Sequence, residues 1–357
     1  MKADTRNIQK GRGAQKNTAN PFSKHQTVQE HWEGIDEVEE TGDRVPSEYI
    51  EVFPKSILNR VESPDIGLSW SMNPFQGCEH GCIYCYARNT HNYWGYSAGT
   101  DFEQKVMIKT NAAELLAKEL SRANWKVEPI MLSGNTDCYQ PAERKFGITR
   151  KLLEVLRDFR HPVGIITKNA LILRDLDILK ELNDMDLVHV NISFTSMQED
   201  LRRVLEPRTS SVNAKLKTIE ALSKAGIPVN VMMAPVIPSI NSHEVFELSK
   251  AVADAGANNI NHLVVRLNGA VGPLFEDWLR LVFPDRADKV MNQIKAIHGG
   301  QANDSRSGIR MKGEGVFAQS MQDQFAIARK KYFKGKERKP YNLEHFVRRD
   351  KEQLMLF

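Results

Sequence analysis

Crowded cysteines constrain this chain more than any other feature of its sequence. Three of the four, Cys78, Cys82 and Cys85, lie within eight residues at the spacing C-x3-C-x2-C. Four cysteines in 357 residues exclude a disulfide scaffold. Three thiolates reach three corners of a 4Fe–4S cube only if the loop folds around it, and Gly77 and Gly81 give the backbone that freedom. With three ligands rather than four, one iron stays open to a substrate or cofactor.

A zinc site is the alternative use of these cysteines. Structural zinc usually has four ligands, commonly supplied as two pairs. His80 would be the fourth ligand, but it lies inside the loop between the first two cysteines. Ordinary buried cysteines rarely crowd in this way, so we favour an iron–sulfur cluster over zinc or simple packing. The lack of further cysteines argues against a second cluster.

The middle of the chain alternates short β-branched runs with amphipathic stretches. Strands are expected at 68–73, 129–133, 163–167, 188–194, 229–235 and 260–267, and helices at 112–123, 148–159, 174–183, 213–225 and 242–255. Strands that alternate with helices form parallel βαβ units. The pattern therefore predicts an α/β fold, an incomplete (β/α)6 TIM-like barrel over 68–270, with its chemistry at the carboxyl ends of the strands.

The remaining segments flank this barrel. We expect a disordered basic arm and acidic linker at 1–45, a lead-in segment at 46–67, a helical extension at 271–333 and a basic tail at 334–357. The helices expected in the extension are 273–283, 286–297 and 317–333, with a polar loop at 299–308.

The net charge of +4 is concentrated at the two ends of the chain. Residues 1–28 hold six basic residues and one acid, and residues 329–357 hold ten Lys or Arg and four Asp or Glu. Basic tails attract phosphate backbones, although a solubilising tail is the simpler explanation. No run of 18 apolar residues and no apolar N-terminal segment occur, so we expect a cytoplasmic protein without a membrane span.

The cysteine motif resembles that of a known family. C-x3-C-x-aromatic-C directly after a first barrel strand is the signature of radical S-adenosylmethionine (radical SAM) enzymes, and the resemblance covers about residues 68–267. It implies that Cys78, Cys82 and Cys85 ligate a 4Fe–4S cluster whose open iron binds the amino and carboxylate groups of S-adenosylmethionine. Reduction by an external electron donor then yields a 5′-deoxyadenosyl radical, which abstracts hydrogen from the substrate. Tyr84 would lie near the adenine, unless it is simply packed.

Polar residues after the strands are the expected cofactor cradle. The run at 133–136 stands where the family usually has Gly-Gly-Glu, a departure shared with the subgroup that resembles spore photoproduct lyase; a simple Gly/Asn turn capped by Asp137 is the alternative. A lysine at a strand end can pair with the methionine carboxylate, and an arginine can clamp a carboxylate with two hydrogen bonds. The expected cofactor-binding residues are Ser133, Gly134, Asn135 and Thr136 after the second strand, Lys168 after the third, Ser193 at the end of the fourth, and Arg208 beyond it.

Cys138 and Tyr139 are the candidate catalytic residues. The subgroup uses a cysteine near this point to return a hydrogen atom to the product radical, but by register that cysteine falls nearer Gly134 than Cys138. Cys138 is therefore a hypothetical hydrogen donor, Tyr139 is a second radical-competent candidate, and an inert cysteine is the alternative.

The last five residues form a candidate docking peptide. Gln353, Leu354, Leu356 and Phe357 belong to a run, Gln-Leu-x-Leu-Phe, that resembles the peptide by which bacterial replication and repair proteins bind the DNA sliding clamp. The alternative is a tail that folds back onto the barrel.

Taken together, these features predict a radical SAM enzyme that acts on damaged or modified nucleic acid. A radical SAM enzyme with a protein or small-molecule substrate is the first alternative, and a non-catalytic iron–sulfur or zinc module is the second.

Overall fold

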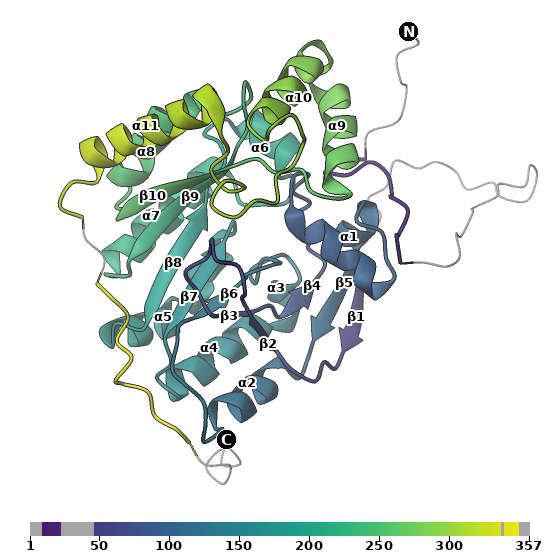
Figure 1. Cartoon of the computed structure of the whole chain (residues 1–357). Coiled ribbons are helices and arrows are strands. Elements are labelled where there is room, and N and C mark those ends of the chain that lie inside the picture. Colours follow the sequence, from purple (N-terminus) through teal and green to yellow (C-terminus); the bar gives the residue numbers. More distant parts are fainter. Residues whose placement is uncertain (1–8, 23–45, 337–338, 350–357) are drawn as a thin grey trace, which may run out of the picture.

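A seven-stranded sheet is the centre of the structure, a computed structural model that describes residues 9–22, 46–336 and 339–349 (Figure 1). The strand order is β10-β9-β8-β7-β6-β3-β2. The strands are β2 (Leu58–Arg60), β3 (Trp70–Met72), β6 (Ile130–Leu132), β7 (Val163–Thr167), β8 (Val188–Ser193), β9 (Val229–Val236) and β10 (Asn259–Val264). All strands except β2 pair in parallel, and these are the predicted strands. The parallel α/β prediction is therefore confirmed. β2, which pairs with β3 antiparallel, was not predicted.

A second, three-stranded sheet was also missed. It consists of β1 (Glu48–Val52), β5 (Lys105–Lys109) and β4 (Phe75–Gln76), in the order β1-β5-β4. β1 lies in the segment that we expected only to lead into the barrel, and β4 directly precedes the cysteine motif. The small sheet therefore fixes the start of that motif against β5.

Helices cover one face of the large sheet, and more follow its last strand (Figure 1). The helices that lie between the strands in chain order are α2 (Ala112–Leu120), α3 (Glu143–Phe146), α4 (Ile148–Asp158), η2 (Ala170–Asp175), α5 (Leu176–Asp184), α6 (Glu199–Leu205), α7 (Val212–Lys224), η3 (Ser242–Glu244) and α8 (Val245–Asp254). Of these, α6 packs with α9 and α10 rather than on the sheet. The extension contains α9 (Val271–Val282), η4 (Pro284–Arg286), α10 (Ala287–Ala296) and α11 (Gly315–Tyr332), close to the predicted helices. The short helices η1 (Tyr86–Trp94) and α1 (Thr100–Gln104) follow the cysteine motif and were not predicted.

The two faces of the large sheet differ in polarity. Successive strand residues point to opposite faces. On β8 and β9, Val190 and Val231 are completely buried in the main hydrophobic core beneath the helices. Their neighbours Asn191 and Asn230 therefore point to the other face, which we call the inner face. The amide groups of these residues can form hydrogen bonds, which the side chains of the hydrophobic face cannot.

A loop at 299–314 connects the two edges of the sheet. On one side, the backbone N–H of Val264 in β10 donates to the carbonyl of Met311 (3.1 Å). On the other side, the carboxylate of Asp65, between β2 and β3, accepts from the backbone N–H of Gly308 (2.6 Å) and forms an ion pair with Arg310. The Gly308 N–H is the first cause of a lowered pKa at Asp65. We call this segment the bridging loop, because it spans the side of the barrel that the strands leave open.

The segment at 339–349 runs along the amino ends of the strands (Figure 1). The carbonyl of Lys339 lies 2.9 Å from Nε2 of His189 in β8, and the ring of Tyr341 lies 3.8 Å from the His189 ring. Phe346 packs against the main core beside Phe159. This part of the expected basic tail is thus seated on the barrel, whereas the candidate docking peptide at 353–357 lies outside the described residues.

The expected disordered arm needs a correction at residues 9–22. Ala14 is buried in a hydrophobic cluster with Ile83 of the cysteine motif. The charge of this segment suggested a solvated arm, but small residues such as Gly13 and Ala14 fit closely against the body. The rest of 1–45 lies outside the described residues.

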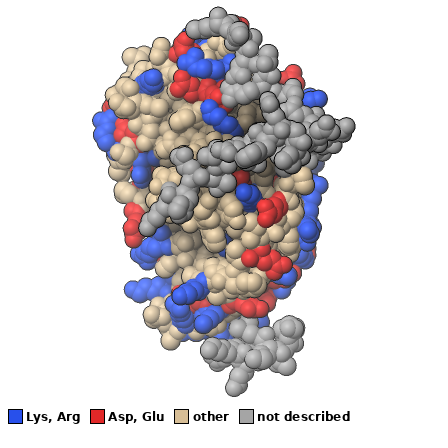
Figure 2. Space-filling model, turned by 90° about the vertical axis from the view of Figure 1, so that its right-hand side faces the viewer, with Lys and Arg blue, Asp and Glu red and all other residues tan. Residues whose placement is uncertain are grey.

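The surface has no single-sign field on the face shown in Figure 2, where Lys and Arg side chains are interspersed with Asp and Glu. In the part of the chain that the structure describes, no helix is long and apolar enough to cross a membrane.

Candidate active site

The cysteine motif forms a tight loop between β4 and η1. Cys78 and Cys82 are buried, Cys85 is half-buried, and all three thiols are free. Gly77 and Gly81 have φ values of 80° and 68°, in the left-handed region that favours glycine, so their predicted role in folding the loop is confirmed. Burial raises the pKa of each thiol, and thiolate ligation therefore needs the positive charge of a bound metal.

Arg88 shapes this loop from inside the protein. Its side chain is completely buried, and its guanidinium donates to the carbonyls of Cys82 (2.9 Å), Gly81 (3.2 Å) and Gly99 (3.0 Å). Nη2 is also 2.5 Å from a carboxylate oxygen of Glu103, which is equally buried. The planar fork of arginine suits several fixed acceptors. The loop conformation is therefore held by a buried ion pair outside the motif.

Residues 9–22 form the outer wall of the same loop. The backbone N–H groups of Gly13 and Ala14 donate to the Glu103 carboxylate at 3.0 and 2.8 Å. A Cβ atom on Gly13 would lie 1.9 Å from the carbonyl oxygen of Gly81, so only glycine fits here. The N-terminal segment is thus part of the site's structure.

Two polar residues inside the motif, Glu79 and His80, have partners within the protein. Glu79 accepts from Arg208 at 3.2 Å. Nδ1 of His80 lies 3.3 Å from the Asp137 carboxylate, and its Nε2 lies 3.2 Å from the amide nitrogen of Asn169. These contacts hold the imidazole between the loops that follow β6 and β7, so His80 is poorly placed as a fourth zinc ligand.

Ser133 and Gly134 bend the chain sharply after β6. Ser133 has a φ of 76°, unusual for a residue with a side chain, and its hydroxyl accepts from the backbone N–H of Cys138 (2.6 Å). The Tyr86 hydroxyl donates to the Gly134 carbonyl. A Cβ atom on Gly134 would lie 2.7 Å from Cβ of Ser71. The predicted turn therefore lies directly beside η1 and the cysteine loop.

Asn135 and Thr136 continue this turn along the cysteine loop. The backbone N–H of Asn135 donates to the side chain of Asn73 (2.7 Å), and the Thr136 hydroxyl donates to the Phe75 carbonyl (2.6 Å). The amide group of Asn135 reaches Thr90 at 3.2 Å. The structure brings the expected cradle and the cysteine motif together, and their roles toward a cofactor stay predictions.

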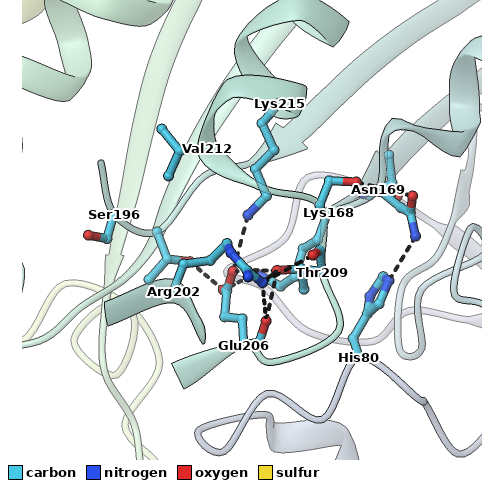
Figure 3. Close-up of polar contacts among 12 residues, drawn as sticks. His80, Lys168, Asn169, Ser196, Arg202, Glu206, Thr209, Val212 and Lys215 are labelled. Atoms are coloured by element: carbon cyan, nitrogen blue, oxygen red, sulfur yellow. Dashed lines mark hydrogen bonds and ion pairs between the residues drawn. The ribbon is translucent and has the colours of Figure 1, made fainter. Parts of the chain in front are cut away.

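Glu206 is the centre of a buried polar network beside the cysteine loop (Figure 3). Its carboxylate is 2.9 Å from Nζ of Lys168, which follows β7, and 3.1 Å from Nζ of Lys215, which lies on α7. It also accepts from the hydroxyls of Thr195 (2.5 Å) and Tyr84. Lys168 in turn donates to the Tyr84 hydroxyl (2.9 Å). Two residues predicted from the sequence, Tyr84 and Lys168, are therefore brought together by one that was not.

The network carries an excess positive charge. Burial alone would raise the pKa of Glu206, but Lys168 and Lys215 outweigh burial and hold this pKa well below its usual value. Burial opposes the charged form of Lys168, and Glu206 still raises its pKa. Burial lowers the pKa of Lys215, against the opposing effect of Glu206. One carboxylate facing two ammonium groups is complementary to a further carboxylate from a ligand.

The remaining candidates are less close to this centre. Ser193 ends β8, as expected, and it is buried there. The guanidinium of Arg208 donates a hydrogen bond to Glu79 and is therefore already engaged within the protein. Cys138 is completely buried in the main core, which raises the pKa of its thiol, and the Tyr139 hydroxyl donates to Asp175 (3.1 Å). Their catalytic roles stay predictions.

Several residues of the site were missed from the sequence: Arg88, Glu103, Thr195, Glu206 and Lys215. Glu206 stands two residues before Arg208, and only the arginine was considered. A buried charge has no signature in a sequence unless its partner is known. The partners of Glu206 lie on other elements: Lys215 is on α7, nine residues away along the chain, and Lys168 follows β7, 38 residues away.

Comparisons with known proteins find similar sequences and a similar fold. Residues 72–252 match the model of the radical SAM superfamily. An uncharacterized protein of Mycobacterium tuberculosis is 34% identical over 66% of this chain and 70% of its own length. A phage protein, the radical SAM Nalpha-GlyT isomerase of Pseudomonas phage M6, is 24% identical over 54% of this chain and 38% of its own length. A solved spore photoproduct lyase with bound AdoMet and dinucleoside spore photoproduct is similar at a TM-score of 0.59, with 16% identity over 80% of each chain.

The chain therefore belongs to the radical SAM superfamily. It is a radical SAM enzyme with a fold like that of spore photoproduct lyase.

Proposed function

We propose that Cys78, Cys82 and Cys85 bind a 4Fe–4S cluster with S-adenosylmethionine beside it, and that the enzyme acts on nucleic acid with a damaged or modified base. The observation that carries the cofactor part is the position of the Glu206 network. It touches the cysteine loop through Tyr84, and its excess positive charge suits the methionine carboxylate.

The donor set fits a cluster better than a single ion. Its three thiols are free and come from one short loop, at the spacing C-x3-C-x2-C. A cube takes each thiolate at a different iron. When bound, the cluster and S-adenosylmethionine supply a 5′-deoxyadenosyl radical that abstracts hydrogen from the substrate.

The chain's own residues position these groups. Arg88 and Glu103 hold the cysteine loop in shape, and residues 9–22 cover it from solvent. Lys168 would hold the methionine carboxylate, with Glu206 and Lys215 fixing its position. The turn at 133–136 would face the amino group.

Support for a nucleic-acid substrate comes from two sources. The similar lyase structure contains a dinucleoside photoproduct, and the basic residues of this chain gather at its ends. A positively charged segment strengthens binding to phosphate backbones in a salt-dependent way.

The test is formation of 5′-deoxyadenosine by the reconstituted, reduced enzyme with S-adenosylmethionine, in the presence of ultraviolet-damaged DNA, undamaged DNA or none. We expect damaged DNA to increase the product, and DNA binding to weaken as salt rises. An equal yield of 5′-deoxyadenosine with damaged DNA, with undamaged DNA and without DNA would exclude the nucleic-acid part of the proposal.

Two further roles are proposals with their own tests. Cys138→Ala in deuterated solvent should change how deuterium partitions into product if this cysteine donates hydrogen; unchanged partitioning and turnover would end that idea.

Deletion of 353–357 should abolish capture by a DNA sliding clamp while the iron content is kept, and retained capture would exclude the docking peptide.

A further inference from the structure

A polar cavity of about 480 Å³ lies at the amino ends of β9 and β10, at the opposite edge of the sheet from the cysteine loop. The C-terminal end of α11 and the residues after it form its other wall. Six lining residues carry the argument: Asn258, Asn259, Asn261, Arg329, Phe333 and Lys336. No Asp or Glu lies among the residues that line it.

The orientation of two asparagine side chains in the cavity is fixed by backbone donors. The N–H of Val229 donates to Oδ1 of Asn258 (2.9 Å), and the N–H of Ile260 donates to Oδ1 of Asn259 (2.8 Å). A backbone N–H cannot donate to an amide nitrogen, so the oxygen of each side chain must face it. The two Nδ2 groups are therefore left as hydrogen-bond donors for a ligand.

A chain of side-chain hydrogen bonds across neighbouring strands fixes the amide orientation of the third asparagine, Asn261. Asn191 donates to the carbonyl of Ile165 (3.2 Å), Asn230 donates to Oδ1 of Asn191 (2.9 Å), and Asn261 donates to Oδ1 of Asn230 (3.1 Å). The Ile165 carbonyl can only accept, and it therefore sets the direction of all these hydrogen bonds. Oδ1 of Asn261 remains as an acceptor at its end.

Two cations complete the cavity. Nη1 of Arg329 donates to the carbonyl of Ile260 (3.3 Å), and Nζ of Lys336 donates to the carbonyl of Ala253 at the end of α8 (2.6 Å). Among the described residues, neither cation has a carboxylate partner, so their charges are not neutralised within this part of the protein.

We propose that this cavity is a second binding site, which takes a small phosphate-bearing ligand of about the size of a nucleotide. Arg329 and Lys336 match the charge of a phosphate, and arginine in particular suits its oxygens. The amide donors of Asn258 and Asn259 match carbonyl acceptors, and Phe333 offers an apolar wall. The volume falls in the range of small-molecule sites, roughly 300–1,000 Å³, rather than that of a single ion. The inference goes beyond the proposed reaction and does not rest on it.

The test is calorimetric titration of the reconstituted full chain with thymidine 5′-monophosphate, inorganic phosphate, thymidine and a single-stranded oligothymidylate. We expect the monophosphate to bind at least about tenfold more tightly than thymidine or inorganic phosphate, because it uses both walls of the cavity. If oligothymidylate binds and competes with the monophosphate, the ligand is a nucleotide unit within a chain. If oligothymidylate does not bind, the ligand is a free nucleotide.

Three variants make the result specific. Arg329→Gln/Lys336→Gln removes both cations, and Asn259→Asp keeps the hydrogen bond from Ile260 while placing a negative charge in the cavity. Each should weaken monophosphate binding about tenfold or more. Lys330→Gln/Lys334→Gln, at exposed positions nearby, makes the same change in net charge and should have no effect. Equal binding to all of these proteins, tight thymidine binding or no binding of any phosphate compound would overturn the site. The titration needs no reductant or S-adenosylmethionine, so its outcome is separate from that of the radical chemistry.

Discussion

Charged side chains have different partners at the two edges of the parallel sheet. At the carboxyl edge, buried charges are paired inside the protein: Glu206 with Lys168 and Lys215, and Arg88 with Glu103. In the cavity at the amino edge, Arg329 and Lys336 donate to backbone carbonyls instead. Removing one member of a buried pair leaves an uncompensated charge, so the carboxyl edge gains fixed positions at the cost of tolerance to substitution. The amino edge keeps donors available to a ligand.

Removing the buried carboxylate of Glu206 at the carboxyl edge should have the largest effect on the free energy of unfolding. Glu206→Gln leaves two buried ammonium groups without their carboxylate and should lower the free energy of unfolding by about 3–5 kcal/mol. Urea denaturation measures this. Adding Lys215→Met should recover part of the loss, and the exposed control Asp200→Asn should change little. A loss below about 1 kcal/mol for Glu206→Gln would show that the network is not truly desolvated.

The amino edge should respond to pH through a buried neutral group. His161, just before β7, accepts from Nε1 of Trp125 (3.2 Å), and burial lowers its pKa to about 4. The unfolded imidazole binds a proton below pH 6.5, and the folded one binds it only near pH 4, so stability is full above pH 6.5 and falls as the pH drops between these values. The loss reaches roughly 3 kcal/mol.

His161→Gln tests this because it keeps an acceptor for Trp125 and removes the titrating ring. Urea denaturation at pH 7 and pH 4.5 should show a smaller acid-induced loss for the variant than for the wild type. The same acid-induced loss in both proteins would assign it to other groups.

A smaller effect should follow from loosening the segment that crosses the amino edge. Phe346 is half-buried and packs on Phe159, so Phe346→Ala should cost about 1–2 kcal/mol of unfolding free energy, less than a fully buried phenylalanine would. The exposed neighbour Leu343 supplies the control, Leu343→Ala. Equal stability of the two variants would mean that the Phe346 ring contributes nothing to the fold.

The smallest effect concerns the bridging loop between the sheet edges. Arg310→Gln removes the ion pair with Asp65 and should speed amide hydrogen exchange in 299–314 without shifting the thermal midpoint. Lys312→Gln is the matched loss of charge on the same loop. Unchanged exchange in Arg310→Gln would show that backbone contacts alone hold the loop.

The parallel sheet could be predicted because its information is local. Hydrophobic runs such as 163–167 give a strand directly, and the cysteine spacing indicates the cluster. β1, β4 and β5 were missed because short strands in a small sheet gain their stability from pairing over long sequence distances. Glu206 was missed for a related reason: its partners Lys168 and Lys215 are assembled only by the barrel. Charge composition misled at 9–22, where Gly13 and Ala14 decide the packing.

We propose that three of the four cysteines hold one cluster at the carboxyl edge. Iron analysis and the visible absorption spectrum after anaerobic reconstitution test it most directly. We expect about four irons per chain for the wild type and for Cys138→Ala, and strongly reduced iron for Ala variants of Cys78, Cys82 and Cys85. Full iron content in any of those three variants, or its loss only in Cys138→Ala, would contradict the account.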